Sequence, residues 1–202
     1  TIERLARSAI FLMLGVFLLT TSGWISDNVR AQDNTDEVFF KAFYSLDEPR
    51  FHCVDIPGHK ERVNVERPLS VHTCKEGIWH RDEIFDLSAV ANGQLRMPEY
   101  DRCLEAESSD LSAKIVLKSC SKSELGTWVY DNYRMKLSAH PDKCLTIGSE
   151  ASELTPGGRR LPSKHTARSL ALEVCDDQTL ERQLWRFEKP QVRTGSILPF
   201  DE

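Results

Sequence analysis

The sequence predicts an all-β domain built from three repeated units. The sequence contains six cysteines, and an aromatic residue follows every second one, at positions 85, 128 and 185. Between them lie short segments rich in Val, Ile, Leu and Phe, which are broken by Pro, Gly, Asn and Asp. Short strands that recur at such spacings are typical of β units that bury a face only together. No long 3.6-residue periodicity follows residue 32, so we expect a single brief helical piece, near Thr179–Leu184.

Composition sets the size and charge of this domain. The chain has 202 residues, of which 40% are hydrophobic and 28% charged, which is typical of one globular domain or two small ones. Its formal net charge is −5, and its longest basic run is Arg159-Arg160. Because binding to nucleic acid depends on neutralising phosphates, we exclude nucleic acid as a partner.

The amino terminus has the features of an export signal. Arg4 and Arg7 precede an apolar run over residues 9–19, and small residues favour cleavage after Ala31 or after Gly23. We therefore predict a signal peptide over 1–31, a linker over 32–35, and a secreted, periplasmic or otherwise extracellular protein. The alternative is an uncleaved membrane anchor, because the apolar stretch reaches 17 residues when it is counted through Ile25. A membrane is a partner only in that second interpretation.

The cysteines agree with export. All six lie beyond the predicted signal, and none forms a C-x-x-C pair, so we expect no metal and no cofactor. An even number in an exported chain predicts three disulfides. The segments after the first members of the pairs resemble one another, as do the segments before the second members. The predicted pairs are Cys53–Cys74, Cys103–Cys120 and Cys144–Cys175.

The repeats are expected at about 36–88, 89–131 and 132–187, followed by a flexible tail over 188–202. Asn92-Gly93 and Asp131-Asn132 are typical of tight turns between strands. The third unit is the longest, and its excess is the polar stretch 149–168. We expect this stretch to form a surface loop whose base is held by the third disulfide.

Three units of Cys-[Leu/Val]-x-x, a second cysteine and a Gln-x-Trp-like element resemble the ricin B-type lectin family. Gln183-Leu184-Trp185 is the best match, Gly126-Thr127-Trp128 lacks the glutamine, and Glu83-Ile84-Phe85 keeps only an acidic and an aromatic residue. The resemblance covers about 36–187. It implies a β-trefoil fold, a non-catalytic carbohydrate-binding function, and a core role for Phe85, Trp128 and Trp185.

The resemblance also implies one shallow sugar pocket in each competent repeat. Such a pocket combines a carboxylate two residues after the first cysteine with an aromatic platform and amide groups. A carboxylate can accept hydrogen bonds from two neighbouring hydroxyls, and an aromatic face suits the C–H side of a sugar. The first repeat fits best, although Asp55 could instead cap the turn at Pro57-Gly58. Its predicted binding residues are Asp55, Ser70, His72, Trp79 and Asp82.

The other two repeats depart further from this pattern. Glu105 supplies a carboxylate in the second repeat but lacks polar companions, so it is a weaker candidate. The third repeat has Thr146 instead, and we expect it to be structural. Its other residues at the family positions are Ala171, Glu173 and Arg182.

Motifs of catalysis are absent from the sequence. It contains no G-x-S-x-G, H-E-x-x-H, P-loop or G-x-G-x-x-G, and the disulfides leave no free thiol. The sequence therefore predicts an exported lectin-like module that is not an enzyme. Two alternatives remain: an interaction trefoil that contacts a protein partner through the 149–168 loop, and an inhibitor of an extracellular enzyme that uses the same loop.

Overall fold

The computed structural model describes residues 36–77 and 80–190. The predicted signal peptide, the linker, Trp79 and the tail from residue 191 lie outside the described residues. Within the described part of the chain, no helix is long and apolar enough to cross a bilayer.

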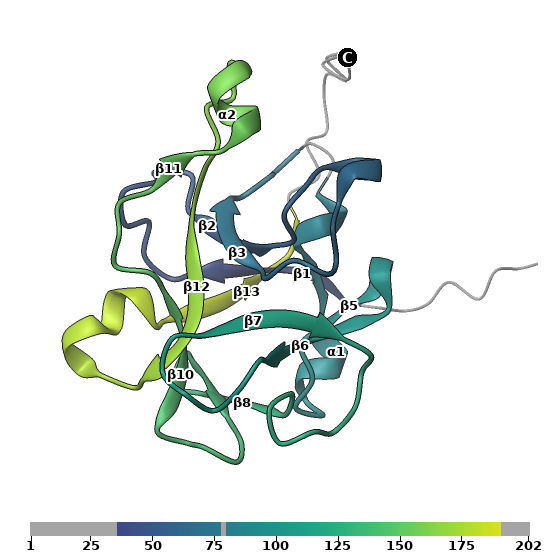
Figure 1. Ribbon diagram of the computed structural model, residues 1–202, viewed down its shortest axis with the longest axis vertical. Helices are drawn as coiled ribbons and strands as arrows, with labels where there is room; N and C mark the ends of the chain where they lie inside the picture. Colours follow the sequence, from purple (N-terminus) through teal and green to yellow (C-terminus); the bar gives the residue numbers. More distant parts are fainter. Residues whose placement is uncertain (1–35, 78–79, 191–202) are drawn as a thin grey trace, which may run out of the picture. The chain divides into compact units, whose positions relative to one another are not determined.

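Strands dominate the described chain, and they fall into three groups of four (Figure 1). The first repeat contains β1 Glu37–Ala42, β2 His52–Asp55, β3 Ser70–Thr73 and β4 Ile84–Asp86. The second contains β5 Arg96–Met97, β6 Arg102–Ala106, β7 Ala113–Lys118 and β8 Trp128–Asp131. The third contains β9 Arg134–Leu137, β10 Lys143–Ile147, β12 Thr166–Val174 and β13 Trp185–Glu188, with the short β11 Glu153–Leu154 inserted.

Helices are short and connect the strands. The α-helices are α1 Leu87–Val90 and α2 Pro156–Arg160. The 3₁₀ helices are η1 Lys60–Arg62, η2 Arg81–Glu83, η3 Pro98–Tyr100 and η4 Asp177–Arg182.

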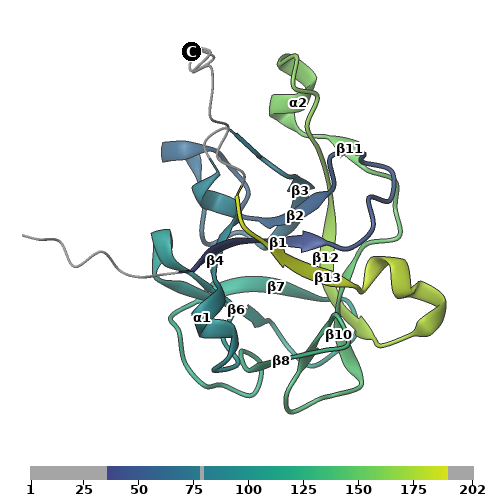
Figure 2. The ribbon, with the colours of Figure 1, turned by 180° about the vertical axis from the view of Figure 1, so that it is seen from behind.

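Antiparallel pairing joins the repeats into a β-trefoil. The second and third strands of each repeat form a hairpin, namely β2–β3, β6–β7 and β10–β12. The long strand β12 also pairs with β3 and β7, and so connects the three hairpins. β1 pairs with both β4 and β13, which brings the first and last strands side by side (Figure 2). The predicted all-β trefoil of three repeats is confirmed.

All three predicted disulfides are present. Their Cα–Cα distances are 5.0 Å for Cys53–Cys74, 4.9 Å for Cys103–Cys120 and 5.0 Å for Cys144–Cys175. Each links the second strand of its repeat to the chain just after the third strand. The similar sequences around the cysteines therefore correspond to equivalent places in the three hairpins.

The predicted core aromatics are buried in the same way in each repeat. Phe85, Trp128 and Trp185 are all among the buried residues of one hydrophobic cluster. The indole nitrogen of Trp128 donates to the carbonyl of Leu104, and that of Trp185 donates to the carbonyl of Leu145, each at 3.0 Å. In both repeats the acceptor follows the first cysteine. The prediction that these aromatics are core residues is confirmed.

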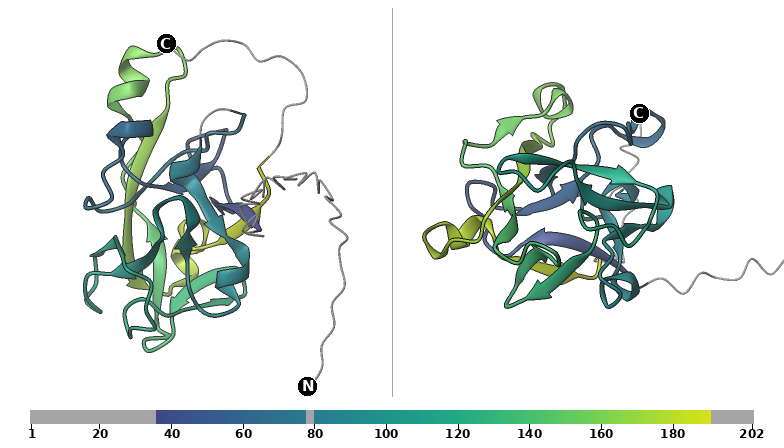
Figure 3. Two further views of the ribbon diagram at one scale, coloured as in Figure 1. Left: turned by 90° about the vertical axis from the view of Figure 1, so that its right-hand side faces the viewer. Right: turned by 60° about the horizontal axis from the view of Figure 1, so that its bottom comes forward.

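Local details differ from the sequence prediction. The β8–β9 turn is centred on Asn132 and Tyr133, which have φ angles of 48° and 64°, one residue later than expected. The helical piece is the 3₁₀ helix η4, and the Leu180 carbonyl accepts from the N–H groups of both Gln183 and Leu184 at its end. The 149–168 stretch holds β11, α2 and the start of β12, and α2 projects beyond the strands in the left view of Figure 3.

Candidate functional site

The fold brings three of the predicted first-repeat residues together and buries them. Asp55 ends β2, His72 lies in the paired strand β3, and Asp82 lies in η2. Asp55 is 2% exposed and Asp82 is fully buried. The ammonium group of Lys75 lies 2.8 Å from Oδ1 of Asp55 and 2.5 Å from Oδ2 of Asp82. A side chain of the protein itself therefore occupies the place where a sugar would meet these carboxylates.

This cluster is electrostatically coupled. Burial raises the pKa of Asp55, although the Lys75 ammonium opposes that rise. Burial also disfavours the charge on Lys75, but the surrounding carboxylates outweigh it and raise the pKa of Lys75. The pair is thus a buried ion pair, whose partners are satisfied by each other and not by solvent.

Ser70 and Trp79 are the other first-repeat candidates. Ser70 begins β3 and is paired with Asp55 across the hairpin. Trp79 lies outside the described residues, so its role as a platform stays a prediction.

Asp55, His72 and Glu83 each offer a ligand atom within 4.8 Å of the others. Since the Lys75 ammonium already lies 3.8 Å from Oε1 of Glu83, a metal ion would have to displace it.

In the second repeat, the Glu105 carboxylate is hydrogen-bonded within the protein. Oε2 of Glu105 accepts a 2.8 Å hydrogen bond from the hydroxyl of Ser123. Gly126 stands where the third repeat has Gln183, and a Cβ built there would lie 3.0 Å from the same Glu105 oxygen. The longer glutamate side chain therefore uses space that a side chain at residue 126 would otherwise fill. Its carboxylate is engaged within the protein.

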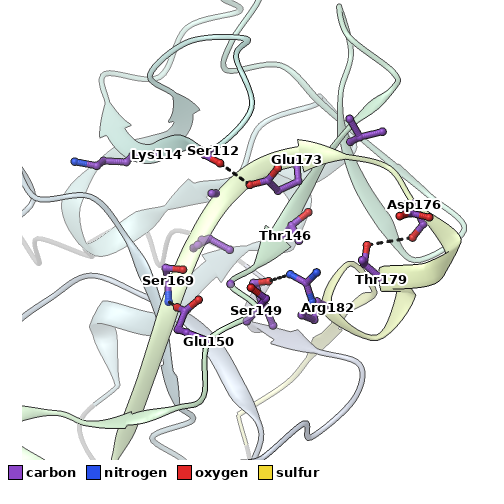
Figure 4. A pocket seen from close by; sticks show the side chains of 15 residues that line it. Ser112, Lys114, Thr146, Ser149, Glu150, Ser169, Glu173, Asp176, Thr179 and Arg182 are labelled. Carbon is purple, nitrogen blue, oxygen red and sulfur yellow. Dashed lines mark hydrogen bonds between the residues drawn. The ribbon is translucent and has the colours of Figure 1, made fainter.

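The third repeat is open. A cavity of about 590 Å³ lies between η4 and the β10–β12 hairpin, within the range of small-ligand sites (Figure 4). All four residues at the family positions line it, although the sequence predicted a structural repeat. Among the fifteen described lining residues none is aromatic. The lining residues that carry polar side chains are Ser112, Lys114, Thr146, Ser149, Glu150, Ser169, Glu173, Asp176, Thr179 and Arg182.

Several of these polar groups are held in place. Oε1 of Glu173 accepts from the Ser112 hydroxyl at 2.9 Å, and Arg182 donates to the carbonyl of Ile147 at 2.8 Å. Oε1 of Glu150 accepts from the backbone N–H of Ser169 at 2.6 Å. Partial burial raises the pKa of Glu150, but the hydrogen bonds from Ser169 prevail and the net pKa is lowered. The lining of the cavity therefore includes a fixed, ionised carboxylate and a fixed guanidinium group.

One position after the second cysteine distinguishes the closed repeat from the open one. It is Lys75 in the first repeat and Asp176 in the third. The lysine reaches inward to Asp55, whereas Asp176 lies at the edge of the cavity. Sequence reasoning missed Lys75 because it compared only the residues that contact sugars in the family. A comparison of the residues that follow the second cysteines would have drawn attention to it.

Comparison with known proteins agrees with the fold. Residues 45–157, more than half of the chain, match the ricin-type β-trefoil lectin domain. The chain belongs to this family. A search among curated proteins finds no match.

Solved structures with the same fold are distant in sequence. The solution structure of the mdaA-1 domain has a TM-score of 0.53 at 16% identity, and covers 78% of this chain and 92% of that one. The earthworm lectin C-terminal domain mutant in complex with 6'-sialyllactose has a TM-score of 0.51 at 12% identity, with 75% of this chain and 97% of that one covered. The Vibrio vulnificus hemolysin/cytolysin β-trefoil lectin with N-acetyl-D-lactosamine bound has a TM-score of 0.52 at 12% identity, with 79% and 98% covered. At such identities the likeness concerns the fold alone.

Proposed function

We propose that this chain is an exported, non-catalytic carbohydrate-binding module, and that the third-repeat cavity holds the sugar. The observation that carries the proposal is the cavity itself, whose lining includes Thr146, Glu173 and Arg182 at the family positions. Membership of the lectin family supports the ligand class. Sugars bound to the earthworm and Vibrio lectins agree with it.

The chemistry of the lining suits a polyol. Sugar hydroxyls both donate and accept hydrogen bonds, and the cavity offers the carboxylates of Glu150 and Glu173 as acceptors and the side chains of Lys114 and Arg182 as donors. Charge-assisted hydrogen bonds of this kind are stronger than neutral ones. Without an aromatic platform, recognition would rest on hydroxyl positions, and single-site affinity would be weak. Useful binding would then require several copies on one surface.

The first repeat is the less favourable place for the sugar. Binding to Asp55 there remains a prediction, and it would require Lys75 to leave two carboxylates in a buried site. The cavity of the third repeat needs no such rearrangement.

A glycan array probed with the oxidised, secreted protein tests the proposal. Glu173→Gln removes the charge and one acceptor at the cavity, and we expect it to lower binding at least tenfold. Lys118→Ala is the matched control, because Lys118 holds the equivalent place in the second repeat and is exposed. If Glu173→Gln bound glycans as strongly as the native protein, the sugar site would lie outside this cavity. Silence of the native protein across the array would contradict the carbohydrate-binding function.

The 149–168 loop supports a second candidate function, which is contact with an acidic partner. The Thr155 hydroxyl accepts from the N–H of Gly158 at 2.9 Å, and Gly158 lies so close to the backbone of His165 that a Cβ would collide with it. The loop is thus ordered by its own contacts. It presents Arg159 and Arg160, which are exposed beside Leu161.

The guanidinium groups on this loop are oriented as well as exposed. Nε of Arg159 donates to the Leu154 carbonyl at 3.0 Å, and Nε of Arg160 donates to the Pro156 carbonyl at 3.1 Å. Reversing both charges, as Arg159→Glu with Arg160→Glu, should abolish binding of a polyglutamate probe and leave sugar binding intact. The control reverses the charges of Lys118 and Lys122, which are exposed and lie outside the 149–168 loop. If both double variants lost polyglutamate binding equally, the effect would be due to net charge and not to this loop.

A further inference from the structure

The third repeat shows how the family glutamine is used. Oε1 of Gln183 accepts from the backbone N–H of Asp176 at 2.9 Å. Its Nε2 donates to the hydroxyl of Thr146 at 3.0 Å and to the carbonyl of Val174 at 2.7 Å. One end of the side chain is therefore an acceptor and the other end a donor, and both are buried.

Glu83 takes the place of this glutamine in the first repeat and keeps only half of the pattern. Its Oε2 accepts from the backbone N–H of Lys75 at 2.8 Å, which is the equivalent of the Gln183–Asp176 contact. Its Oε1 stands where the glutamine has its amide nitrogen. That oxygen is fully buried and has no hydrogen-bond partner. Nδ1 of His72 lies 3.4 Å from it but donates to the carbonyl of Thr73 at 2.7 Å. A carboxylate oxygen has replaced a donor at a place that requires one.

The surroundings of Glu83 are rich in negative charge. Carboxylate oxygens of Glu83 and Asp55 and a ring nitrogen of His72 lie within 4.8 Å of one another. With Asp82, three buried carboxylates face the single ammonium group of Lys75. Two negative charges would remain uncompensated, which is very unfavourable in a buried site.

No other described group balances this excess. Burial lowers the pKa of His72, against the attraction of Asp55, so its ring is neutral at pH 7. The remaining titratable groups that interact with the cluster are His52, His59, His165, Glu76 and Tyr100. Burial lowers the pKa of His52 and of His165 to about 4, so both rings are neutral at pH 7. Burial lowers the pKa of His59, and burial raises the pKa of Tyr100, so both are uncharged near neutrality. Glu76 adds a further carboxylate, whose partner is Lys41.

We propose that Glu83 is a neutral carboxylic acid in the folded protein, with its proton on Oε1 as a donor toward Asp55, and that this proton and Lys75 together hold the first-repeat position closed. The proton restores the donor that Gln183 supplies in the third repeat. It also removes one of the two uncompensated charges. Burial raises the pKa of Glu83 well above its usual range, in agreement with the geometry.

The proposal gives the first repeat a dependence on pH that the third repeat lacks. When the proton leaves as the pH rises, two adjacent carboxylates repel each other and the Asp55–Lys75 contact is weakened. The pKa of Glu83 is higher in the folded chain than in the unfolded chain, where it is about 4.3. Its contribution to stability is therefore complete below pH 4 and is lost as the pH rises toward the folded pKa. The proposal is independent of sugar binding by the third repeat.

Reciprocal substitutions test this inference. Glu83→Gln gives the first repeat the donor without a titratable proton, and Gln183→Glu places a buried carboxyl group in the third repeat where the amide of Gln183 donates to Thr146. Infrared difference spectra at pH 7 should contain the band of a protonated carboxylic acid in the native protein, and Glu83→Gln should lose it. Thermal unfolding should match between the native protein and Glu83→Gln at pH 4. The variant should then become more stable than the native protein as the pH rises to 8.

Two results would overturn the inference. One is a carboxylic-acid band that is absent from the native protein, or that persists in Glu83→Gln, which would place the proton elsewhere. The other is a stability difference between the native protein and Glu83→Gln that does not change from pH 4 to 8. If Glu83→Gln does not fold, Gln183→Glu decides: it should acquire a second acid band and lose stability with rising pH, and the absence of both changes counts against the proposal.

Discussion

The indole nitrogen of Trp185 donates a 3.0 Å hydrogen bond to the carbonyl of Leu145, and Trp128 makes the same bond to Leu104. Each bond joins the last strand of a repeat to the strand that carries the first cysteine of that repeat. It satisfies a carbonyl group inside the hydrophobic cluster. The recurring tryptophan is therefore a core residue that also completes the hydrogen bonding of the β-trefoil.

Trp185→Phe should destabilise the protein although it conserves an aromatic ring. The substitution leaves the buried Leu145 carbonyl without its donor, which is expected to lower the free energy of unfolding by about 1–3 kcal/mol. Urea denaturation at pH 7 measures this change. Trp128→Phe should give a loss of similar size, because the same bond is removed. A negligible effect in both variants would mean that water replaces the indole donor.

Asp55→Ala should lower the free energy of unfolding, because Asp55 is a buried structural partner of Lys75. It leaves the Lys75 ammonium with one fewer carboxylate in a buried site, and the loss of one partner of a buried pair costs about 3–5 kcal/mol. Asp131→Ala is the control, because Asp131 pairs with Lys136 while its own side chain is 47% exposed. Such a surface pair contributes about 0–1 kcal/mol. Equal stability of the two variants would show that Asp55 is not a structural partner of Lys75.

The three disulfides should stabilise the protein in proportion to the logarithm of their loop lengths. The separations are 17 residues for Cys103–Cys120 and 31 for Cys144–Cys175. Removal of each pair by double alanine substitution should lower the free energy of unfolding by roughly 3–4 kcal/mol, more for the longer loop, in the chain-entropy account. Chemical denaturation of the two variants tests the order. The reverse order would indicate that native packing around the cysteines outweighs loop entropy.

Acid should destabilise the region around His52. Burial lowers the pKa of His52 to about 4, although Asp47 opposes the shift, so the folded protein keeps this imidazole neutral. The unfolded chain binds a proton near pH 6.5, and its stability relative to the folded chain therefore increases as the pH falls from 6.5 to 4. NMR titration of the imidazole protons measures the folded pKa. A value near 6.5 for His52 would contradict this prediction.

The number of repeats, the disulfide pairing and the core aromatics were predictable from the sequence. Each depends on residues that lie near one another along the chain, such as Cys53 and Val54 or Gln183 and Trp185, and the repeats supply three versions of the same local pattern. Turn positions were less certain, and the β8–β9 turn moved by one residue. There Asn132 and Tyr133 both adopt left-handed conformations, and the carbonyl of Tyr133 accepts from the N–H of Trp185.

The sequence by itself thus determined that this chain has three repeats and resembles the β-trefoil lectin family, because the cysteines and the Gln-x-Trp-like elements recur in the same local order in each repeat. Only the tertiary structure decided which repeat is open. Asp55 was the best match to a sugar-binding carboxylate, yet Lys75, the residue after Cys74, pairs with it and fills the site. Thr146 was a poor match, yet its surroundings leave a cavity. Whether a carboxylate is available to a ligand depends on which charges lie around it in space, and spacing along the chain does not encode that.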